Sequence, residues 1–172
     1  MVKLIALFKR KAGISVEQFQ GHWRTTHAEL VVRQRGLRRY VQNHTLASAY
    51  HSGKPATGKP ATGEPATGEP VSREPDSREP DYDGVAEAWF DDTQAMRELG
   101  ASAEYRAVRA DEVNFIDAAS MQVVITDEIV IVDGAVPEPS VKMISCLNKR
   151  PDVTAEFFQR YWRETHGQIA AR

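Results

Sequence analysis

The chain has 172 residues, 41% of them hydrophobic, and a net charge of −2. This length predicts one or two domains, and the balanced charge gives no basis for binding nucleic acid, which needs a basic surface. No apolar run approaches the roughly 20 residues that cross a bilayer, and residues 1–11 become charged too soon for a signal peptide. With a single cysteine, Cys146, no intrachain disulfide can form, and we expect a cytoplasmic protein without membrane contact.

The beginning of the chain recurs at its end. Residues 2–33 read VKLIALFKRKAGISVEQFQGHWRTTHAELVVR, and residues 141–172 read VKMISCLNKRPDVTAEFFQRYWRETHGQIAAR. Such a repeat indicates a duplicated unit of one strand and one helix. We therefore interpret residues 1–134 as one complete domain and residues 141–172 as an incomplete second copy that holds only the first strand and helix.

The first elements follow from local pattern. Residues 2–8 form a β-type apolar run. Ser15 with Gln18 forms a capping-box pattern, which predicts a helix that continues to about Gln34 and ends at Gly36. The apolar side chains that would face the core from this helix are Phe19, Trp23, Leu30 and Val31.

Residues 39–47 alternate like a second strand, and a low-complexity segment follows at residues 53–81. This segment repeats a five-residue unit with proline and contains no large apolar side chain, so we expect a disordered insert. A proline-rich ligand for a partner protein is the alternative interpretation.

After the insert, residues 84–90 predict a third strand and residues 92–102 a second helix. A less regular segment with Phe115 and Ile116 precedes a final strand, or pair of strands, at residues 121–132. The order β-α-β-β-α-β predicts an α+β, ferredoxin-like fold, with the insert between its second and third strands.

Helices cover only one face of such a sheet, so the other face needs a cover. Tyr40, Gln42 and His44 share one side of the second strand, and we expect them to line a cavity between two sheets packed as an α/β barrel. Because the second repeat is incomplete, a second copy of the chain would supply the other sheet in a homodimer.

Four segments together resemble the EthD family of dimeric α/β-barrel proteins. They read FQGHWRTTHAELV, GLRRYVQNH, YDGVAEAWFDD and DEVNFID, and Phe19, Trp23, His27 and Leu30 match the family's F-x-x-x-W-x-x-x-H-x-x-L pattern. The resemblance implies a small catabolic protein of a family commonly grouped with oxidoreductases. Some members accompany a haem-thiolate monooxygenase in ether degradation, and related fungal proteins act as decarboxylases or dehydratases.

His27 is the first candidate for catalysis, because it shares the inward helix face with Trp23 and an imidazole suits acid–base work near neutral pH. The alternative is a structural histidine that anchors the helix end. His44 and Tyr40 form a second candidate acid/base pair, or else they are ordinary polar groups of a cavity or interface.

We expect Gln42 and the aromatic residues Trp89, Phe115 and Trp23 to contact the substrate, with core packing as the alternative role. No HExxH, CxxC, GxGxxG or GxSxG pattern occurs, so we predict neither a metal nor a cofactor, and haem is a narrower alternative. Two functions remain open: a cofactor-independent enzyme that acts by histidine-mediated proton transfer on a hydrophobic carbonyl or phenol metabolite, and a non-catalytic accessory protein that binds such a ligand.

Overall fold

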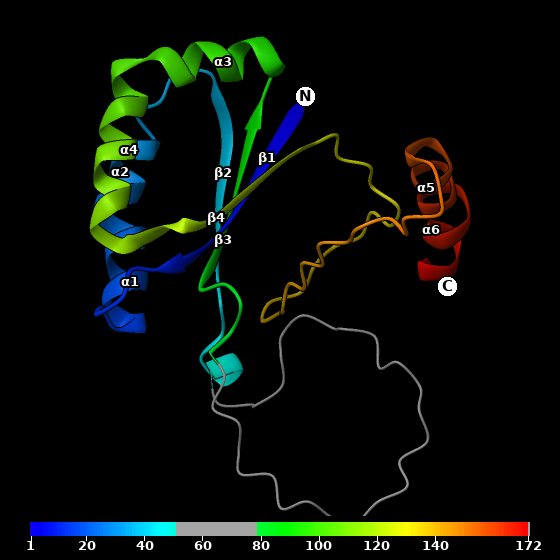
Figure 1. Cartoon of the computed structure of the whole chain (residues 1–172), viewed down its shortest axis with the longest axis horizontal. Helices are drawn as coiled ribbons and strands as arrows, with labels where there is room; N and C mark the ends of the chain where they lie inside the picture. Colours follow the sequence, from blue (N-terminus) through cyan, green and yellow to red (C-terminus); the bar gives the residue numbers. More distant parts are fainter. Residues whose placement is uncertain (51–78, 172) are drawn as a thin grey trace, which may run out of the picture. The chain divides into compact units, whose positions relative to one another are not determined.

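A computed structural model describes residues 1–50 and 79–171. The chain divides into two units, of which the first ends at Asp127 and the second begins at Glu128. Most of the expected insert, residues 53–78, lies outside the described residues. The first unit carries the complete fold (Figure 1). Its elements in chain order are β1 (Val2–Arg10), α1 (Val16–His22), the π-helical turn η1 (Trp23–His27), α2 (Ala28–Val31), β2 (Leu37–His44), the short 3-10 helix η2 (Ala47–Tyr50), β3 (Gly84–Phe90), α3 (Thr93–Ala101), α4 (Ala103–Phe115) and β4 (Ile116–Thr126).

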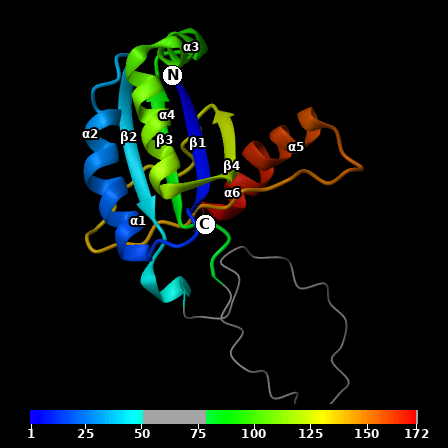
Figure 2. The same ribbon diagram turned by 60° about the vertical axis from the view of Figure 1, so that its left-hand side comes forward.

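The four strands form one antiparallel sheet in the order β2-β3-β1-β4. In β1, Leu4 lies opposite Ala88 of β3 and Ile125 of β4, which fixes the register of the central strand. Helices α1, α2 and α4 all lie on one face of this sheet (Figures 1 and 2). The predicted ferredoxin-like, α+β architecture is confirmed.

Three helices of the first unit begin at side chains that cap their first turns. The Ser15 hydroxyl accepts from the backbone N–H of Gln18, and the Gln18 side chain accepts from the backbone N–H of Ser15, which confirms the capping box. Asp92 caps α3, and Ser102 caps α4 by accepting from Tyr105 at 3.0 Å. The segment before Phe115 forms the 13-residue helix α4, so the irregular structure expected there was wrong.

The core lies between the helices and the sheet. Phe19 and Trp23 are fully buried and pack with Phe8 of β1 and Phe115 of α4. The ring centroids of Phe8 and Trp23 are 5.0 Å apart in an edge-to-face arrangement, which aromatic quadrupoles favour. These aromatic side chains join α1 and η1 to β1.

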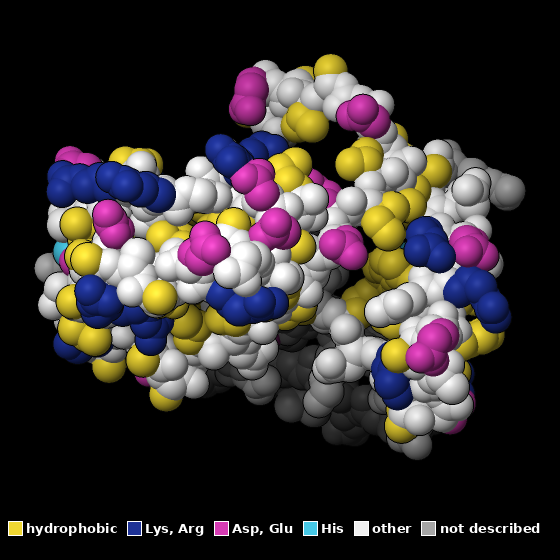
Figure 3. All heavy atoms as spheres, turned by 90° about the horizontal axis from the view of Figure 1, so that it is seen from above, with side chains coloured by type: hydrophobic (Ala, Val, Ile, Leu, Met, Phe, Trp, Pro, Cys, Tyr) yellow, Lys and Arg dark blue, Asp and Glu magenta, His cyan; other side chains and the backbone are white. Residues whose placement is uncertain are grey.

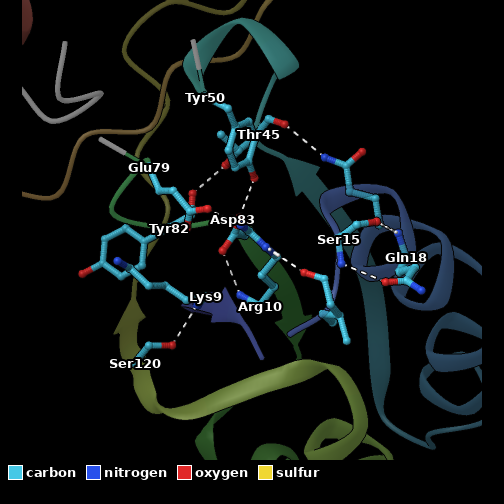
Figure 4. Close-up of polar contacts among 12 residues, drawn as sticks. Lys9, Arg10, Ser15, Gln18, Thr45, Tyr50, Glu79, Tyr82, Asp83 and Ser120 are labelled. Carbon is cyan, nitrogen blue, oxygen red and sulfur yellow. Dashed lines mark hydrogen bonds and ion pairs between the residues drawn. The ribbon is translucent and has the colours of Figure 1, made fainter. Parts of the chain in front are cut away.

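A cluster of polar side chains lies where β2 ends and β3 begins, on either side of the insert in sequence (Figure 4). The buried Asp83 carboxylate accepts from the Arg10 backbone at 2.8 Å, the Arg10 guanidinium at 2.5 Å and the Tyr50 hydroxyl at 2.6 Å. Nearby, the Thr45 hydroxyl donates to the backbone carbonyl of Tyr82 at 2.7 Å. Both ends of the connection between β2 and β3 are therefore attached to the domain, whatever lies between them.

The second unit contains α5 (Ala155–Tyr161), the π-helical turn η3 (Trp162–His166) and α6 (Gly167–Ala170). This helix reproduces the first one: Thr154 caps it as Ser15 caps α1, and the π-turn falls on the same W-R-x-T-H segment. Among the described residues, 127–132 and 141–148 form no strand, so the strands expected there are absent. Trp162 is 44% exposed, whereas its counterpart Trp23 is fully buried.

The helices and the surface charge of the described residues show two further features. None of their helices has both the length and the apolar character needed to span a membrane. On the face drawn in Figure 3, basic and acidic side chains are interspersed, with no large area of one sign.

Gly84 tests the packing of the core. A Cβ atom at this position would lie 2.5 Å from Cζ3 of Trp23 and 3.3 Å from Cε2 of Phe8. We predict that Gly84→Ala lowers the free energy of unfolding by about 1–3 kcal/mol, the usual cost of an overpacked core.

Chemical denaturation of the full chain measures this effect, and Gly100→Ala is the matched control. A Cβ at Gly100 meets no atom within 4 Å and lies within helix α3, so this change should be neutral or slightly stabilising. Equal effects of the two substitutions would contradict the packing described for Trp23.

Candidate functional site

A cavity of about 140 Å³ lies between the helices and the sheet of the first unit. Its sheet side is largely apolar and comprises Leu4, Ala6 and Phe8 of β1, Ala86, Ala88 and Phe90 of β3, Leu37 and Tyr40 of β2, and Ile116, Met121 and Val123 of β4. The polar side chains that line it are His27, Gln34, Tyr40, Tyr105, Arg109 and Glu112. A mostly apolar pocket with a few convergent polar groups is typical of a site for a small organic ligand.

His27 is the most buried titratable group of this cavity, with 4% of its surface exposed. Its Nδ1 atom lies 2.9 Å from Oδ2 of Asp111, and its Nε2 atom has no hydrogen-bond partner in the described part of the chain. Because a carboxylate accepts the Nδ1 proton, the neutral ring carries its lone pair on Nε2. Burial lowers the pKa of His27, and the bond to Asp111 opposes this only in part, so the ring is neutral at pH 7.

Asp111 of α4 holds a second imidazole as well. Nε2 of His22 lies 2.9 Å and 3.1 Å from the two carboxylate oxygens, and the Asn114 amide donates to Oδ1 at 3.3 Å. Burial of Asp111 acts against its charge, but the bonds from His27, His22 and Asn114 outweigh it and lower its pKa. The carboxylate therefore stays ionised and orients both rings.

Neither His22 nor Asp111 was predicted from the sequence as a residue of the site. His22 and His27 are five residues apart, and in a regular α-helix such positions do not share a face. The π-helical turn η1 inserts the extra residue that lets both rings reach one carboxylate. Spacing alone gives no signal for this; the one available indication was the acidic DEVNFID segment that contains Asp111.

Tyr40 lies in the same cavity as His27. Its hydroxyl oxygen accepts from Nε1 of Trp23 at 2.9 Å, and burial raises its pKa. The hydroxyl is therefore a neutral hydrogen-bond donor over the physiological range. Trp23 also lines the cavity, so three of the predicted site residues come together there.

His44 and Gln42 lie on the same side of β2 as Tyr40, but they contact Trp23 and do not line the cavity. The Gln42 amide donates to the backbone carbonyl of Trp23 at 2.7 Å, and its oxygen lies 3.1 Å from Nε2 of His44. The His44 ring packs 4.5 Å from the Trp23 ring, and its buried Nδ1 has no partner among the described residues. Burial lowers the pKa of His44.

We expected this side of β2 to face a cavity between two packed sheets, and this expectation was wrong. Tyr40, Gln42 and His44 face the helices and not the sheet face that the helices leave bare. Alternation along a strand tells which residues share a face, but it does not tell which face the helices cover.

The last two predicted substrate contacts lie elsewhere. Phe115 is a core residue whose ring packs 4.9 Å from His27 and 4.8 Å from His22. Trp89 lies on the opposite face of the sheet, where Lys3 and Arg39 sit over its ring at 4.4 Å and 4.8 Å. Neither residue lines the cavity.

Glu112, which the sequence analysis also missed, lines the cavity beside Arg109. Burial raises its pKa to about 7, although its ion pair with Arg109 acts in the other direction. A carboxyl group with so high a pKa inside a cavity is a candidate for proton transfer. It follows Asp111 directly in sequence, but the structure gives the two carboxyl groups different partners.

The described residues contain no group of three or more His, Cys, Asp or Glu side chains arranged to hold a metal ion. The volume of about 140 Å³ suits a ligand of one ring and is much too small for a porphyrin. The residues that line the cavity can therefore donate, accept and transfer protons around a small ligand.

Comparisons with known proteins extend these observations. Among solved structures, an EthD family protein from Bacillus halodurans is 21% identical, with 75% of this chain and 99% of that chain covered and a TM-score of 0.49. A dimeric ferredoxin-like protein from Bacteroides fragilis is 13% identical, with 74% and 95% covered and a TM-score of 0.45. SnoaB, a cofactor-independent oxygenase from Streptomyces nogalater, is 16% identical, with 80% and 97% covered and a TM-score of 0.42.

A search of curated proteins finds no match in sequence. The comparison with protein families matches residues 11–119 to the EthD domain, in a span that contains His27, Tyr40, Asp111 and Glu112. Because this span is more than half of the 172 residues, the chain belongs to the EthD domain family.

Proposed function

We propose that the cavity binds a small, largely apolar metabolite with a carbonyl or phenol group, and that His27 transfers a proton to or from it without a cofactor. The observation that carries the proposal is the arrangement of His27. It is a buried, neutral imidazole that Asp111 fixes through Nδ1, so that Nε2 is left to act as the base.

The size and polarity of the cavity support the ligand class. Its volume of about 140 Å³ is close to the ~150 Å³ of an engineered apolar cavity that admits benzene. The lining side chains of β1, β3 and β4 offer only apolar contacts, while Tyr40 of β2 offers a hydroxyl that can donate to a carbonyl or phenolic oxygen. A single ring with one polar oxygen satisfies both features.

Acetophenone, a one-ring ketone, tests the proposal. We expect wild-type protein in deuterated buffer to catalyse exchange of its methyl protons with solvent, followed by proton NMR. His27→Gln should lower the enzymatic rate by about 100-fold or more, the usual value of a positioned base.

His166→Gln is the matched control, because His166 is the counterpart of His27 in the second helix and its side chain is exposed. It should leave the rate unchanged, and a melting curve should show that both variants are folded. Exchange that His27→Gln leaves intact would overturn the proposed role of His27. Binding of acetophenone without any exchange in the wild type would favour the accessory, non-catalytic function.

We also propose that the protein is a homodimer in which the sheet face without helices meets its copy. Within residues 1–127, helices cover only the cavity side of the sheet. The bare face includes Ile5 of β1 and its partner Val124 of β4, which is 45% exposed. This face also carries Lys3 and Arg39 beside Trp89, so it is of mixed character, and its apolar side chains need a cover.

Light scattering on the full chain should therefore give the mass of a dimer. Val124→Glu should shift the chain towards the monomer by placing a charge on this face, whereas Val113→Glu, at an exposed position of α4, should not. A wild-type protein that is monomeric at every concentration would contradict the proposed dimer.

A further inference from the structure

We propose that Glu112 is a second proton-transfer group of the cavity and that it protonates the carbonyl oxygen of a small ketone while His27 removes a proton from the adjacent carbon. The cavity would then catalyse enolisation, a keto–enol proton shift. This inference rests on the proposed function, and it adds the acid partner and the reaction class.

The position of Glu112 allows this role. It lies on α4, directly after Asp111, and its side chain lines the same cavity as His27 and Tyr40. Only 16% of the Glu112 side chain is exposed, and its carboxyl group contacts the guanidinium of Arg109, which is 45% exposed. The carboxyl group is therefore within the cavity, while Arg109 connects it to solvent.

The charged and titratable groups around Glu112 come from every element that packs there. On α4 itself, Arg109 favours the charged carboxylate and Asp111 disfavours it. Tyr105, also on α4, lines the cavity as well. Tyr40 of β2 shares the cavity and is neutral, and so is His27 of η1. Burial outweighs Arg109 and raises the pKa of Glu112 to about 7.

The pKa values of His27 and Glu112 are shifted in opposite directions from their ordinary values, and this difference separates the roles of the two groups. The pKa of His27 is lowered, so its ring stays a neutral base in more acidic solution than a free imidazole does. The pKa of Glu112 is raised, so its carboxyl group keeps its proton up to about pH 7. Just below neutral pH, one group therefore accepts a proton while the other has a proton to give.

The proposed step balances without an oxidant or a reductant. Nε2 of His27 takes the proton of the carbon next to the carbonyl, and the electrons of that C–H bond form the C=C bond of the enol. The electrons of the carbonyl π bond take the proton of Glu112 and form the O–H bond. The products are the enol, an imidazolium held by Asp111 and a carboxylate held by Arg109, and the reverse transfers restore the enzyme.

The pH dependence of acetophenone exchange tests this inference on the full-length protein. The wild-type rate should fall as pH rises through about 7, because Glu112 loses the proton that it has to donate. Glu112→Gln keeps the shape but cannot transfer a proton, so it should lower the rate by about 100-fold and remove this alkaline decline. Glu104→Gln, on the same helix but away from the cavity, should change neither the rate nor the profile.

The outcomes separate this inference from the proposed function. If exchange depends on His27 but Glu112→Gln keeps both the rate and the alkaline decline, Glu112 is not the acid and the role of His27 stands. If acetophenone shifts the NMR signals of cavity residues and the wild type still gives no exchange, enolisation is overturned. If neither acetophenone nor phenol shifts those signals, the proposed ligand class fails as well.

Discussion

The carboxylate of Asp111 is the interaction on which the site depends. It accepts from His22 and His27 at 2.9 Å each, and it can reach both only because η1 is a π-helical turn. One charge therefore fixes the ring orientation of His27, selects the nitrogen that carries the proton and joins η1 to α4. Without this carboxylate, nothing would fix the tautomer that leaves the Nε2 lone pair of His27 available to a ligand.

Trp23 makes the corresponding connection between the helices and the sheet. Its indole N–H donates to Tyr40, and its backbone carbonyl accepts from Gln42, so one residue uses both a side-chain and a main-chain group to bind β2. The indole ring can pack at this position because Gly84 has no side chain. Since Trp23 and Tyr40 also line the cavity, the same contacts that hold the fold together shape the site.

Much of the fold was predictable, because it rests on local signals. The capping box at Ser15 and the apolar strands at residues 2–8 and 84–90 give the element order, and the element order gives the ferredoxin-like topology. The presence of His27 and Tyr40 at one site was also predicted from the sequence, although the face that holds them was not. The duplication likewise predicted a second capped helix, which α5 and α6 form without the strand that should precede it.

The rest was not predictable for physical reasons. A π-turn changes which residues share a helix face, and no spacing rule built on 3.6 residues per turn pairs His22 with His27. The roles of Asp111 and Glu112 depend on which side of α4 meets the cavity, and that helix was not predicted from the sequence. The titration of Glu112 in turn depends on burial, which a sequence does not contain.

The most direct test of this account is a nitrogen-15 NMR titration of the His27 imidazole in the full-length protein. The account predicts a neutral ring with its proton on Nδ1 at pH 7 and a pKa lower than that of a free imidazole, together with loss of the fixed Nδ1–H form in Asp111→Asn. A ring with its proton on Nε2, or one that is already charged at pH 7, would contradict it.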